Sequence, residues 1–410
     1  MSKYVIIGNS AAAIGCVEGI RSVDNTGDIT IVSSEEHHVY SRPLISYLLQ
    51  KKTDLKRMKY RPESFYDENH CDIIYKNTAA SIDPEKKSVY LSTGRSLSYE
   101  KLLVAVGSSP FIPPMAGLES VPERFAFSCL DDALALEKAL TPTSRVLIIG
   151  AGLIGLKCAE GISGMAGSIT IVDMSPRVLS SILDEDSSKI VQQHLEEHGL
   201  KLILSDSVDS FAGGRAILKS GQSIDFDILV TAVGVRANVS LVKDAGGECG
   251  RGITIDSSCK TSLPEVYAAG DCTESVDVVT GQTRVMALLP NAYMQGYCAG
   301  RSMAGDAEAG FTNAMPMNSI GLFGLHIMTA GSYEGETYDS YDNGFKRLFY
   351  KDNRLVGFII AGDTSKTGIY TSLIRNRVPL DTIDFPLICE RPTLMAFSKE
   401  TRKEFLGCAR

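Results

Sequence analysis

The chain has 410 residues, 44% of them hydrophobic and 22% charged, with a formal net charge of −8 at pH 7. This length exceeds one ordinary core, so we expect two or three globular domains, and the acidic balance argues against nucleic acid, whose phosphates are bound by an excess of Lys and Arg. No run reaches the roughly 18 apolar residues that span a membrane, and the start MSKYVIIGNS lacks the charged n-region of a secretion signal, so we expect a cytoplasmic protein without a membrane partner.

Two stretches of the chain share one order of predicted elements: a strand, a glycine, a helix and a second strand. The first stretch consists of KYVII at 3–7, Gly8, a helix over 10–21 and ITIV at 29–32. The second consists of RVLII at 145–149, Gly150, a helix over 153–163 and ITIV at 169–172. The chain therefore contains two βαβ units of one type.

Two later strands complete these units. DILVTAVG at 227–234 ends the second unit, whereas VYAAGD at 266–271 lies beyond it and returns to the first, so the first domain is expected to be discontinuous. Further on, FKRLFY, a tight turn at Asp352 and Asn353, and LVGFIIAG predict a hairpin, followed by a helix over 366–375. The predicted fold class is α/β, with two Rossmann-like, three-layer domains around parallel sheets and a small α+β C-terminal domain.

The ten cysteines are scattered, without a CxxC or CxxxxC pair. This spacing encodes no zinc ribbon, iron-sulfur cluster or redox disulfide locally, so we expect no metal site. Most of the thiols, Cys129 and Cys272 among them, are expected to be buried structural residues in a reducing compartment.

The sequence GAGLIG at 150–155 has the spacing of a dinucleotide-binding turn. A pyrophosphate requires a tight turn, no side chain where the backbone meets its oxygens, and a helix N-terminus whose free N–H groups attract anions; Gly150, Gly152 and Gly155 meet these requirements. Asp173 lies 173 − 150 = 23 residues further on, where an acid accepts hydrogen bonds from a ribose and repels a 2′-phosphate. We therefore predict NADH rather than NADPH, with Arg177 either solvated or turned towards such a phosphate.

The first turn, GNSAAA at 8–13, is less regular. Gly8, Ser10 and Ala13 stand where three glycines would, with Ser10 at the closest approach to the pyrophosphate. Glu35 follows the second strand, where it can hold an adenosine ribose. The alternative is a glycine-rich turn in an unrelated α/β protein, and two such turns in one chain argue against it.

A further group of residues predicts a flavin site. Asp271, at the end of VYAAGD, can reach a polyhydroxyl chain at the carboxyl edge of the sheet, so we expect it to bind the ribityl group. A helix beginning near Asn291 would point its positive end at the flavin pyrimidine and stabilise the charge that builds up on reduction.

Together these residues resemble the FAD-dependent pyridine nucleotide-disulfide oxidoreductase superfamily, and within it the branch of NADH:rubredoxin reductases and nitrite-reductase flavodomains. Besides both turns, the resemblance includes YSRPLIS at 40–46, YEKLLVAVGSSP at 99–110, VYAAGDCTE at 266–274, AYMQG at 292–296 and LVGFIIAGDTSKTG at 355–368. It implies an FAD-binding domain over 1–109 and 236–315, an inserted NAD-binding domain over 110–235, and a C-terminal interface domain over 316–410 through which a homodimer can form.

The resemblance also implies cofactor-binding roles within these motifs. Arg42 and Pro43 would line the FAD pyrophosphate and flavin, and Gln295 would lie near the cofactor. Further cofactor contacts are implied for Ala105, Gly107 and Gly270.

Departures from the superfamily narrow the subclass. Disulfide reductases have a cysteine pair in the first FAD helix, where this chain has only Cys16, and the peroxidase and coenzyme A-disulfide branches have a cysteine just before the segment that reads SRPLIS here. Ferredoxin reductases of aromatic-ring oxygenases carry a tryptophan motif, and this chain has no tryptophan. Nitrite reductase needs iron-sulfur and sirohaem domains that 410 residues do not accommodate. Because both cysteine arrangements are missing, a thiol-based reaction is not expected.

The predicted function is that of an FAD-dependent NADH oxidoreductase. A flavin accepts hydride at N5 and exchanges electrons singly, which suits a one-electron partner. We expect this partner to be rubredoxin, ferredoxin or an iron-sulfur subunit, with electron flow in either direction and a place in anaerobic metabolism. Two alternatives remain: a thiol-independent NADH oxidase that reduces oxygen, and a redox-sensing interaction protein controlled by NADH.

Two charge patterns concern the entry and exit of electrons. In ferredoxin reductases a lysine after the RPxxS segment pairs beside the flavin N5 with a glutamate two residues after the third fingerprint glycine, and the matching positions here are Tyr47 and Lys157. Both are candidate catalytic residues, and Lys157 would favour the anionic reduced flavin unless it points into solvent. The basic segment KKTDLKRMKYR at 51–61, with Asp54 as its only acid, is either a dock for an acidic electron carrier or a solvated face.

Overall fold

The computed structural model describes residues 2–342 and 344–405, and its first sheet is built on the N-terminal strand. Five strands pair in parallel in the order β3-β2-β1-β6-β17, and the start of β6 continues into an antiparallel extension with β5 and β4. Residues 4–7 of β1 and all of β2 are buried on both faces, which suits their largely apolar sequences. The bounds are β1 (Ser2–Ile7), β2 (Ile29–Val32), β3 (Cys71–Ile74), β4 (Ala79–Asp83), β5 (Ser88–Leu91), β6 (Ser96–Val104) and β17 (Val266–Ala268).

The second sheet repeats this topology with five parallel strands in the order β11-β10-β9-β15-β8. Both predicted βαβ units are therefore confirmed, and so is the return of VYAAGD to the first sheet, because β17 pairs with β6. A three-stranded antiparallel sheet, β12-β13-β14, adjoins the second sheet in sequence. The bounds are β8 (Arg124–Phe125), β9 (Arg145–Ile149), β10 (Ser168–Asp173), β11 (Lys201–Leu204), β12 (Val208–Ala212), β13 (Arg215–Leu218), β14 (Ser223–Asp225) and β15 (Ile228–Thr231).

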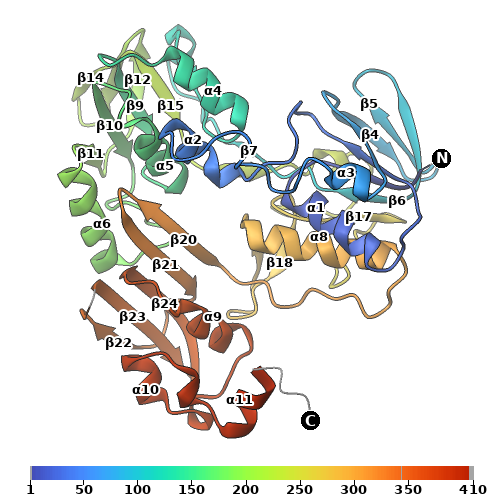
Figure 1. Ribbon diagram of the computed structural model, residues 1–410. Helices are drawn as coiled ribbons and strands as arrows, with labels where there is room; N and C mark the ends of the chain where they lie inside the picture. The colour runs from blue at the N-terminus through green and yellow to red at the C-terminus, as the bar shows by residue number, and fades with distance from the viewer. Residues whose placement is uncertain (1, 343, 406–410) are drawn as a thin grey trace.

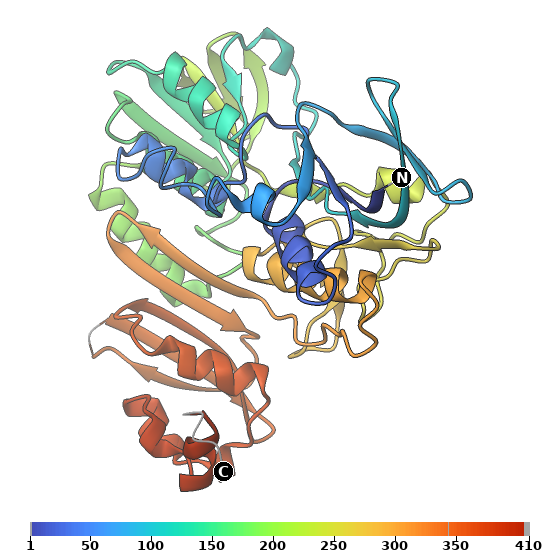
Figure 2. The same cartoon turned by 45° about the vertical axis from the view of Figure 1, so that its right-hand side comes forward.

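Helices cover the sheets, and α1 lies against α8 in both views (Figures 1 and 2). The two helices approach so closely that a Cβ on Gly296 would lie 1.9 Å from the carbonyl oxygen of Ala12, so this position requires glycine. No helix in the described part of the chain is long and apolar enough to cross a membrane. The bounds are α1 (Ala11–Arg21), α2 (Ile45–Leu49), α3 (Phe65–Glu68), α4 (Leu130–Ala139), α5 (Leu153–Ile162), α6 (Glu185–Glu197), α7 (Ser240–Lys243), α8 (Leu289–Met303), α9 (Thr367–Arg375), α10 (Phe385–Glu390) and α11 (Lys399–Phe405).

Two short strands carry the chain between the first and second sheets. β7 (Ser108–Pro110) pairs antiparallel with β16 (Val235–Ala237), and a separate hairpin, β18 (Glu274–Val276) with β19 (Thr283–Val285), follows β17. Figure 1 shows the first sheet on the right and the second at the upper left. The domain boundaries expected at 109/110, 235/236 and 315/316 stay predictions.

The C-terminal part is a five-stranded antiparallel sheet in the order β20-β21-β24-β23-β22, with α9 and α10 packed on one face. The predicted hairpin and the helix after it are confirmed, because β23 and β24 are joined at Asp352 and Asn353, whose φ angles of 50° and 59° suit a tight turn. The bounds are β20 (Met317–Leu322), β21 (Leu325–Gly331), β22 (Glu336–Ser340), β23 (Gly344–Lys351) and β24 (Arg354–Gly362).

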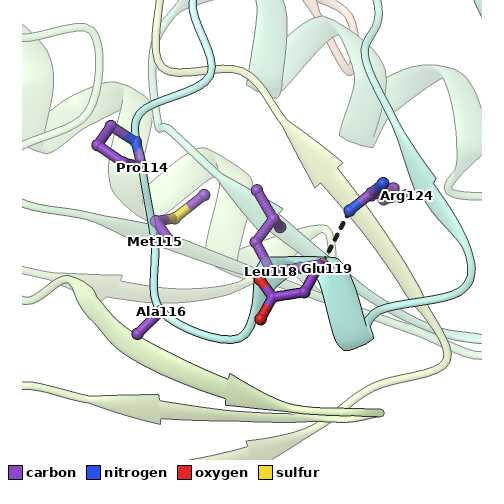
Figure 3. Close-up of a pocket in the computed structure, with 6 residues that line it drawn as sticks. All are labelled: Pro114, Met115, Ala116, Leu118, Glu119 and Arg124. Atoms are coloured by element: carbon purple, nitrogen blue, oxygen red, sulfur yellow. Dashed lines mark hydrogen bonds between the residues drawn. The ribbon is translucent and has the colours of Figure 1, made fainter.

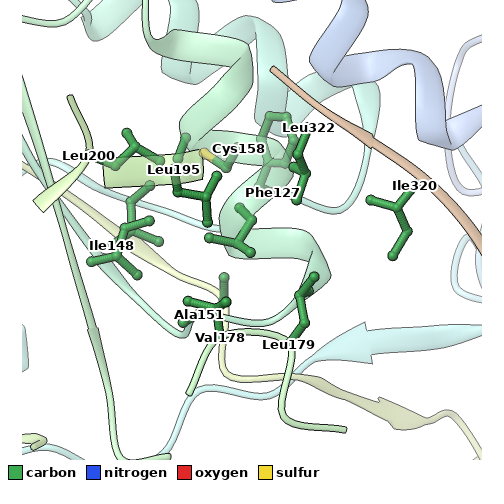
Figure 4. Packing of buried hydrophobic residues seen from close by; sticks show 14 of the residues in the cluster. Phe127, Ile148, Ala151, Cys158, Val178, Leu179, Leu195, Leu200, Ile320 and Leu322 are labelled. Carbon is green, nitrogen blue, oxygen red and sulfur yellow. The ribbon is translucent and has the colours of Figure 1, made fainter. Parts of the chain in front are cut away.

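One hydrophobic cluster joins all three parts of the molecule. Ile45 of α2, Cys158 of α5 and Leu322 of β20 are buried in the same cluster. Figure 4 shows Ile320 and Leu322 reaching from β20 towards the side chains of the second sheet and its helices. This junction fixes the C-terminal sheet against the helix that begins at the second fingerprint turn.

Candidate active site

The two fingerprint turns have nearly the same backbone geometry. Gly8 has φ +115° and Gly150 has φ +113°, a region that side chains disfavour. A Cβ on Gly8 would lie 2.1 Å from the carbonyl oxygen of Ala105, and a Cβ on Gly150 would lie 2.3 Å from that of Ala232. Each turn therefore passes close to the end of a neighbouring strand and leaves its helix start at the sheet edge.

Both helix starts leave their first N–H groups available to an anion. Ser10 precedes α1 and Gly152 precedes α5, and neither position has a side-chain cap. A Cβ on Gly152 would meet no atom within 4 Å, so this side of the turn is open. At the third position a Cβ on Gly155 would lie 2.0 Å from the oxygen of Gly150, whereas Ala13 is accommodated fully buried. The irregular first turn is thus sterically complete without three glycines.

Asp173 closes β10 beside the second turn. One carboxylate oxygen accepts a hydrogen bond from the Ala151 N–H at 2.6 Å, and the other accepts one from the Ser175 N–H at 2.7 Å. The interpretation of Arg177 as a solvated residue is wrong, since its side chain is half-buried and donates to the Ser180 carbonyl at 3.4 Å. Asp173 therefore presents a fixed negative charge next to the start of α5.

Glu35 occupies the matching place after β2, and it already has partners. It accepts a hydrogen bond from the Tyr40 hydroxyl at 2.7 Å and forms an ion pair with Arg42. Arg42 also donates to the Ser128 carbonyl at 3.1 Å, and Pro43 lies next to it in a short 3-10 helix. Arg42 and Glu35, predicted at different parts of the cofactor, thus form one unit at the edge of the first sheet.

Asp271 lies just beyond β17, after a turn at Gly270 with φ +88°. Burial raises the pKa of Asp271, although the charge of Arg42 and a hydrogen bond from Ser108 act in the opposite direction. The charge of Arg42, the predicted pyrophosphate ligand, thus favours the ionised form of Asp271, the predicted ribityl ligand.

Gln295, on α8, holds the turn that presents Asp271. Its side-chain oxygen accepts hydrogen bonds from the Gly270 N–H at 2.7 Å and the Thr273 hydroxyl at 3.2 Å, and its amide group donates to the Ser275 hydroxyl at 2.5 Å. Gln295 is buried, so this network shapes the edge of the sheet from beneath.

Asn291 lies in the first turn of α8, which begins two residues earlier than expected because Pro290 is accommodated there. Its amide nitrogen donates to the Met315 carbonyl at 3.2 Å, but its side-chain oxygen is buried without a partner. Such an acceptor is costly unless a ligand donates to it. Since the Cβ position of Gly107 is also open, these residues fit a flavin with its donor groups at the start of α8.

Lys157 and Tyr47 are brought together across the packing of α2 on α5. The Lys157 ammonium lies 4.3 Å from the centre of the Tyr47 ring and donates to the Gly321 carbonyl at 2.9 Å. The alternative that Lys157 points into solvent is wrong, because its side chain is only 14% exposed. Glu160, which forms an ion pair with Lys157, was not predicted; the only signal in the sequence is its spacing of three residues from Lys157 on one helix.

The cysteines singled out in the sequence are free thiols with structural surroundings. Cys16 and Cys272 are buried, but the expectation that Cys129 is buried is wrong, because it is half-buried just before α4. Burial raises the pKa of all three, to about 12 for Cys272 and about 11 for Cys129. These thiols stay protonated at neutral pH, which disfavours a thiolate reaction at these positions.

The basic segment at 51–61 has more carboxylate partners than its sequence suggests. Arg57 pairs with Asp54 at 2.9 Å, but Lys59 and Arg61 also have carboxylate partners, Glu63 and Glu18. Two acids from outside the segment therefore neutralise part of its charge. The exposed lysines Lys51, Lys52 and Lys56 remain as a smaller patch.

A surface hollow lies on the chain after β7, lined by Pro114, Met115, Ala116, Leu118, Glu119 and Arg124 (Figure 3). Arg124 donates to the Leu118 carbonyl at 3.0 Å, which closes one wall. None of the predicted site residues lines this hollow.

Comparison with known proteins agrees with this geometry. Residues 2–296 match the model of the pyridine nucleotide-disulphide oxidoreductase family, and residues 316–378 match that of the rubredoxin NAD+ reductase C-terminal domain. The chain is 30% identical over 392 residues to the NADH-dependent phenylglyoxylate dehydrogenase subunit epsilon of Aromatoleum evansii, covering 92% of this chain and 93% of that one. It is 31% identical over 395 residues to an NADH oxidase of Methanocaldococcus jannaschii, covering 88% and 87% of the two chains.

A third relative is the NADH-rubredoxin oxidoreductase of Clostridium acetobutylicum, 26% identical over 371 residues, or 89% of this chain and 92% of the relative. A solved structure of NADH:rubredoxin oxidoreductase from the same organism superposes with a TM-score of 0.74 at 24% identity, covering 93% of this chain and 96% of that one. The resemblance inferred from the motifs is confirmed over most of the sequence. The chain belongs to the pyridine nucleotide-disulphide oxidoreductase family.

Proposed function

We propose that this chain, an FAD-dependent NADH oxidoreductase, exchanges electrons with a rubredoxin-type or other small iron-sulfur carrier. The observation that carries the proposal is the pair of fingerprint turns with matching geometry, Gly8 and Gly150, in one chain whose C-terminal part matches the rubredoxin NAD+ reductase domain. When bound, FAD supplies the step between two-electron hydride chemistry and one-electron transfer. The protein's task is then to hold both dinucleotides at one site and to exclude competing reactions.

The residues have distinct roles in this proposal. The start of α5 binds the NADH pyrophosphate and Asp173 binds its adenosine ribose. The start of α1 and Arg42 bind the FAD pyrophosphate, and Glu35 binds the adenosine ribose of FAD. Asp271 binds the ribityl chain, the Asn291 side-chain oxygen accepts a hydrogen bond from a flavin N–H, and the N-terminus of α8 stabilises negative charge on the flavin pyrimidine. The raised pKa values of Cys16, Cys129 and Cys272 disfavour a route for the electrons through these thiols.

The partner is either a separate carrier or a subunit of a larger complex. The phenylglyoxylate dehydrogenase relative is named as a subunit, and this chain covers 93% of its length. We propose that the redox partner here is an iron-sulfur protein in either arrangement. A homodimer through 316–410 and a cytoplasmic location stay predictions.

Anaerobic turnover with NADH and oxidised rubredoxin or ferredoxin tests the proposal against the NADH oxidase alternative, which the Methanocaldococcus jannaschii relative favours. The proposal expects reduction of one of these carriers to be faster than oxygen uptake under air. Oxygen uptake that exceeds carrier reduction would favour the oxidase.

A further inference from the structure

Glu160 is a buried acid at the junction of the three parts of the molecule. Its carboxylate is 5% exposed and forms an ion pair with Lys157, one turn earlier on α5. Its second oxygen accepts a hydrogen bond at 2.8 Å from the N–H of Phe323, at the turn between β20 and β21. Phe323 has φ 48°, so the tip of this C-terminal hairpin is held in a tight turn against α5.

The ammonium group of Lys157 is held by three different elements. α5 contributes Glu160, β20 contributes the Gly321 carbonyl at 2.9 Å, and α2 contributes the ring of Tyr47 at 4.3 Å. Lys52 is a second cation near that ring, at 6.0 Å and exposed. The position of the Lys157 ammonium group is therefore set by three elements together: α2, α5 and the hairpin of β20 and β21.

The charges of Lys157 and Glu160 nearly cancel each other in the parent protein. Removing one partner of a buried ion pair leaves an uncompensated charge in a poorly solvated place, whereas removing both leaves none. An uncompensated lysine favours a nearby anion, and an uncompensated carboxylate disfavours it.

This junction contains helices that continue from the predicted NADH-binding turn and from the predicted FAD-binding segment. Lys157 is in the second turn of α5, the helix that begins at the open Gly152 position. Tyr47 is in α2, which directly follows the short helix of Arg42 and Pro43, and the charge of Arg42 acts on Asp271. A change of charge here is therefore expected to act on a flavin held by Asp271.

We infer that Glu160 is a positioning residue that holds Lys157 against Tyr47 and the C-terminal hairpin, cancels its charge, and so sets the reduction potential of the flavin. The inference rests on the proposed function, because it requires FAD at the Asp271 site and NADH as reductant.

The experiment compares the flavin midpoint potential of four full-length holoproteins: the parent, Glu160→Gln, Lys157→Met and the double variant. Glu160→Gln keeps an oxygen for the Phe323 N–H and removes only the charge, so the potential should rise. Lys157→Met should lower it, and the double variant should return close to the parent. We expect roughly a tenfold change in the ratio of reduced to oxidised flavin at a fixed NADH/NAD+ ratio, in opposite directions for the two single variants.

Two matched controls accompany the set. Glu185→Gln removes the acid of the exposed Lys189–Glu185 pair on α6, and its potential should match the parent. Tyr47→Phe keeps the ring under Lys157 and should have a smaller effect than either charge change. Thermal unfolding of the same proteins should show each single variant less stable than the double variant, which supports the pairing even where a single variant loses flavin.

Potentials that match the parent in both single variants, or that shift in the same direction, would overturn the role of Glu160. A parent protein that binds no FAD or is not reduced by NADH would instead overturn the proposed function. The two failures are therefore distinguishable.

Discussion

The carboxylate of Asp173 accepts a hydrogen bond from the backbone N–H of Ala151 at 2.6 Å, which ties the end of β10 to the second fingerprint turn. A second hydrogen bond, from Ser175, fixes the other oxygen. The acid is therefore oriented by the backbone before any nucleotide binds, and its charge lies where the adenosine ribose of a dinucleotide is expected.

This orientation predicts a preference for NADH. The substitution Asp173→Ala should lower kcat/KM for NADH, because charged hydrogen bonds to the ribose are lost; the fall corresponds to about 1 to 3 kcal/mol of transition-state stabilisation. It should also reduce the ratio of kcat/KM for NADH to that for NADPH. Arg177→Met is the companion variant, because Arg177 is the residue that the sequence offers as an alternative ligand for a 2′-phosphate. Comparable kcat/KM values for NADH and NADPH in the parent would contradict the assignment of Asp173.

Asp271 should lower the stability of the flavin-free protein at neutral pH and raise its affinity for flavin. Burial raises the pKa of Asp271, so the ionised carboxylate is disfavoured in the folded protein. The protonated carboxyl therefore favours folding at low pH, and this contribution to the free energy of unfolding is lost as the pH rises through the raised pKa. Asp271→Asn should therefore leave the flavin-free protein at least as stable at neutral pH, while flavin affinity falls about tenfold or more. Fluorescence titration of FAD and thermal unfolding measure the two effects. Unchanged affinity would remove Asp271 from the site.

The exposed lysines of the basic segment should steer an acidic electron carrier. Neutralising Lys51, Lys52 and Lys56 together should reduce the salt dependence of electron transfer, because exposed charges act on the association rate and are screened by salt. Lys219 and Lys243, exposed in other parts of the surface, provide a control pair. A salt dependence that survives the triple substitution would assign the dock to another surface.

Arg347 should hold the C-terminal sheet to the second sheet and its helices. It bonds Asp184 at 2.7 Å and Asp186 at 3.1 Å from one nitrogen, and Asp339 at 2.6 Å from another. Arg347→Met should lower the free energy of unfolding by on the order of 1 to 2 kcal/mol. Arg215→Met, in the exposed pair with Asp225, should change it little.

The same network predicts a pH dependence. Burial alone would raise the pKa of Asp184, but hydrogen bonds from Ser187 and Arg347 outweigh it, and the pKa is lowered. The stabilisation is thus present above the ordinary Asp pKa of about 4 and is lost as the pH falls through the lowered value. The parent should lose more stability than Arg347→Met on acidification in urea unfolding. Parallel losses would show that the Arg347–Asp184 pair is not the cause.

Both βαβ units could be predicted from the sequence because each consists of local patterns: an apolar run, a turn glycine and a helical period. The pairing of β17 with β6 could be predicted as well, since the strand lies beyond a unit that is already complete. The first turn was correctly assigned to a strand-to-helix turn without three glycines because only Gly8 occupies a backbone conformation that excludes side chains, whereas Ala13 is simply buried.

The junction could not be predicted in the same way. Glu160 and Phe323 are 163 residues apart, and no local pattern indicates which hairpin tip meets α5. The partner of Arg61, Glu18, lies 43 residues earlier on α1, so the sequence of the basic segment does not show that this positive charge is paired. Side-chain contacts between distant segments follow from packing, which periodicity does not encode.

The central claim is that electrons pass from NADH through the bound flavin to an iron-sulfur carrier. Anaerobic stopped-flow mixing of the holoprotein with NADH and oxidised rubredoxin, and in a separate run with oxidised ferredoxin, tests it most directly, with flavin and carrier followed at separate wavelengths. The account predicts that the flavin bleaches first and that two rubredoxin molecules, each taking one electron, are then reduced per NADH oxidised, faster than oxygen is consumed in the aerobic experiment. A flavin that bleaches but leaves both rubredoxin and ferredoxin oxidised while oxygen is rapidly reduced would contradict it.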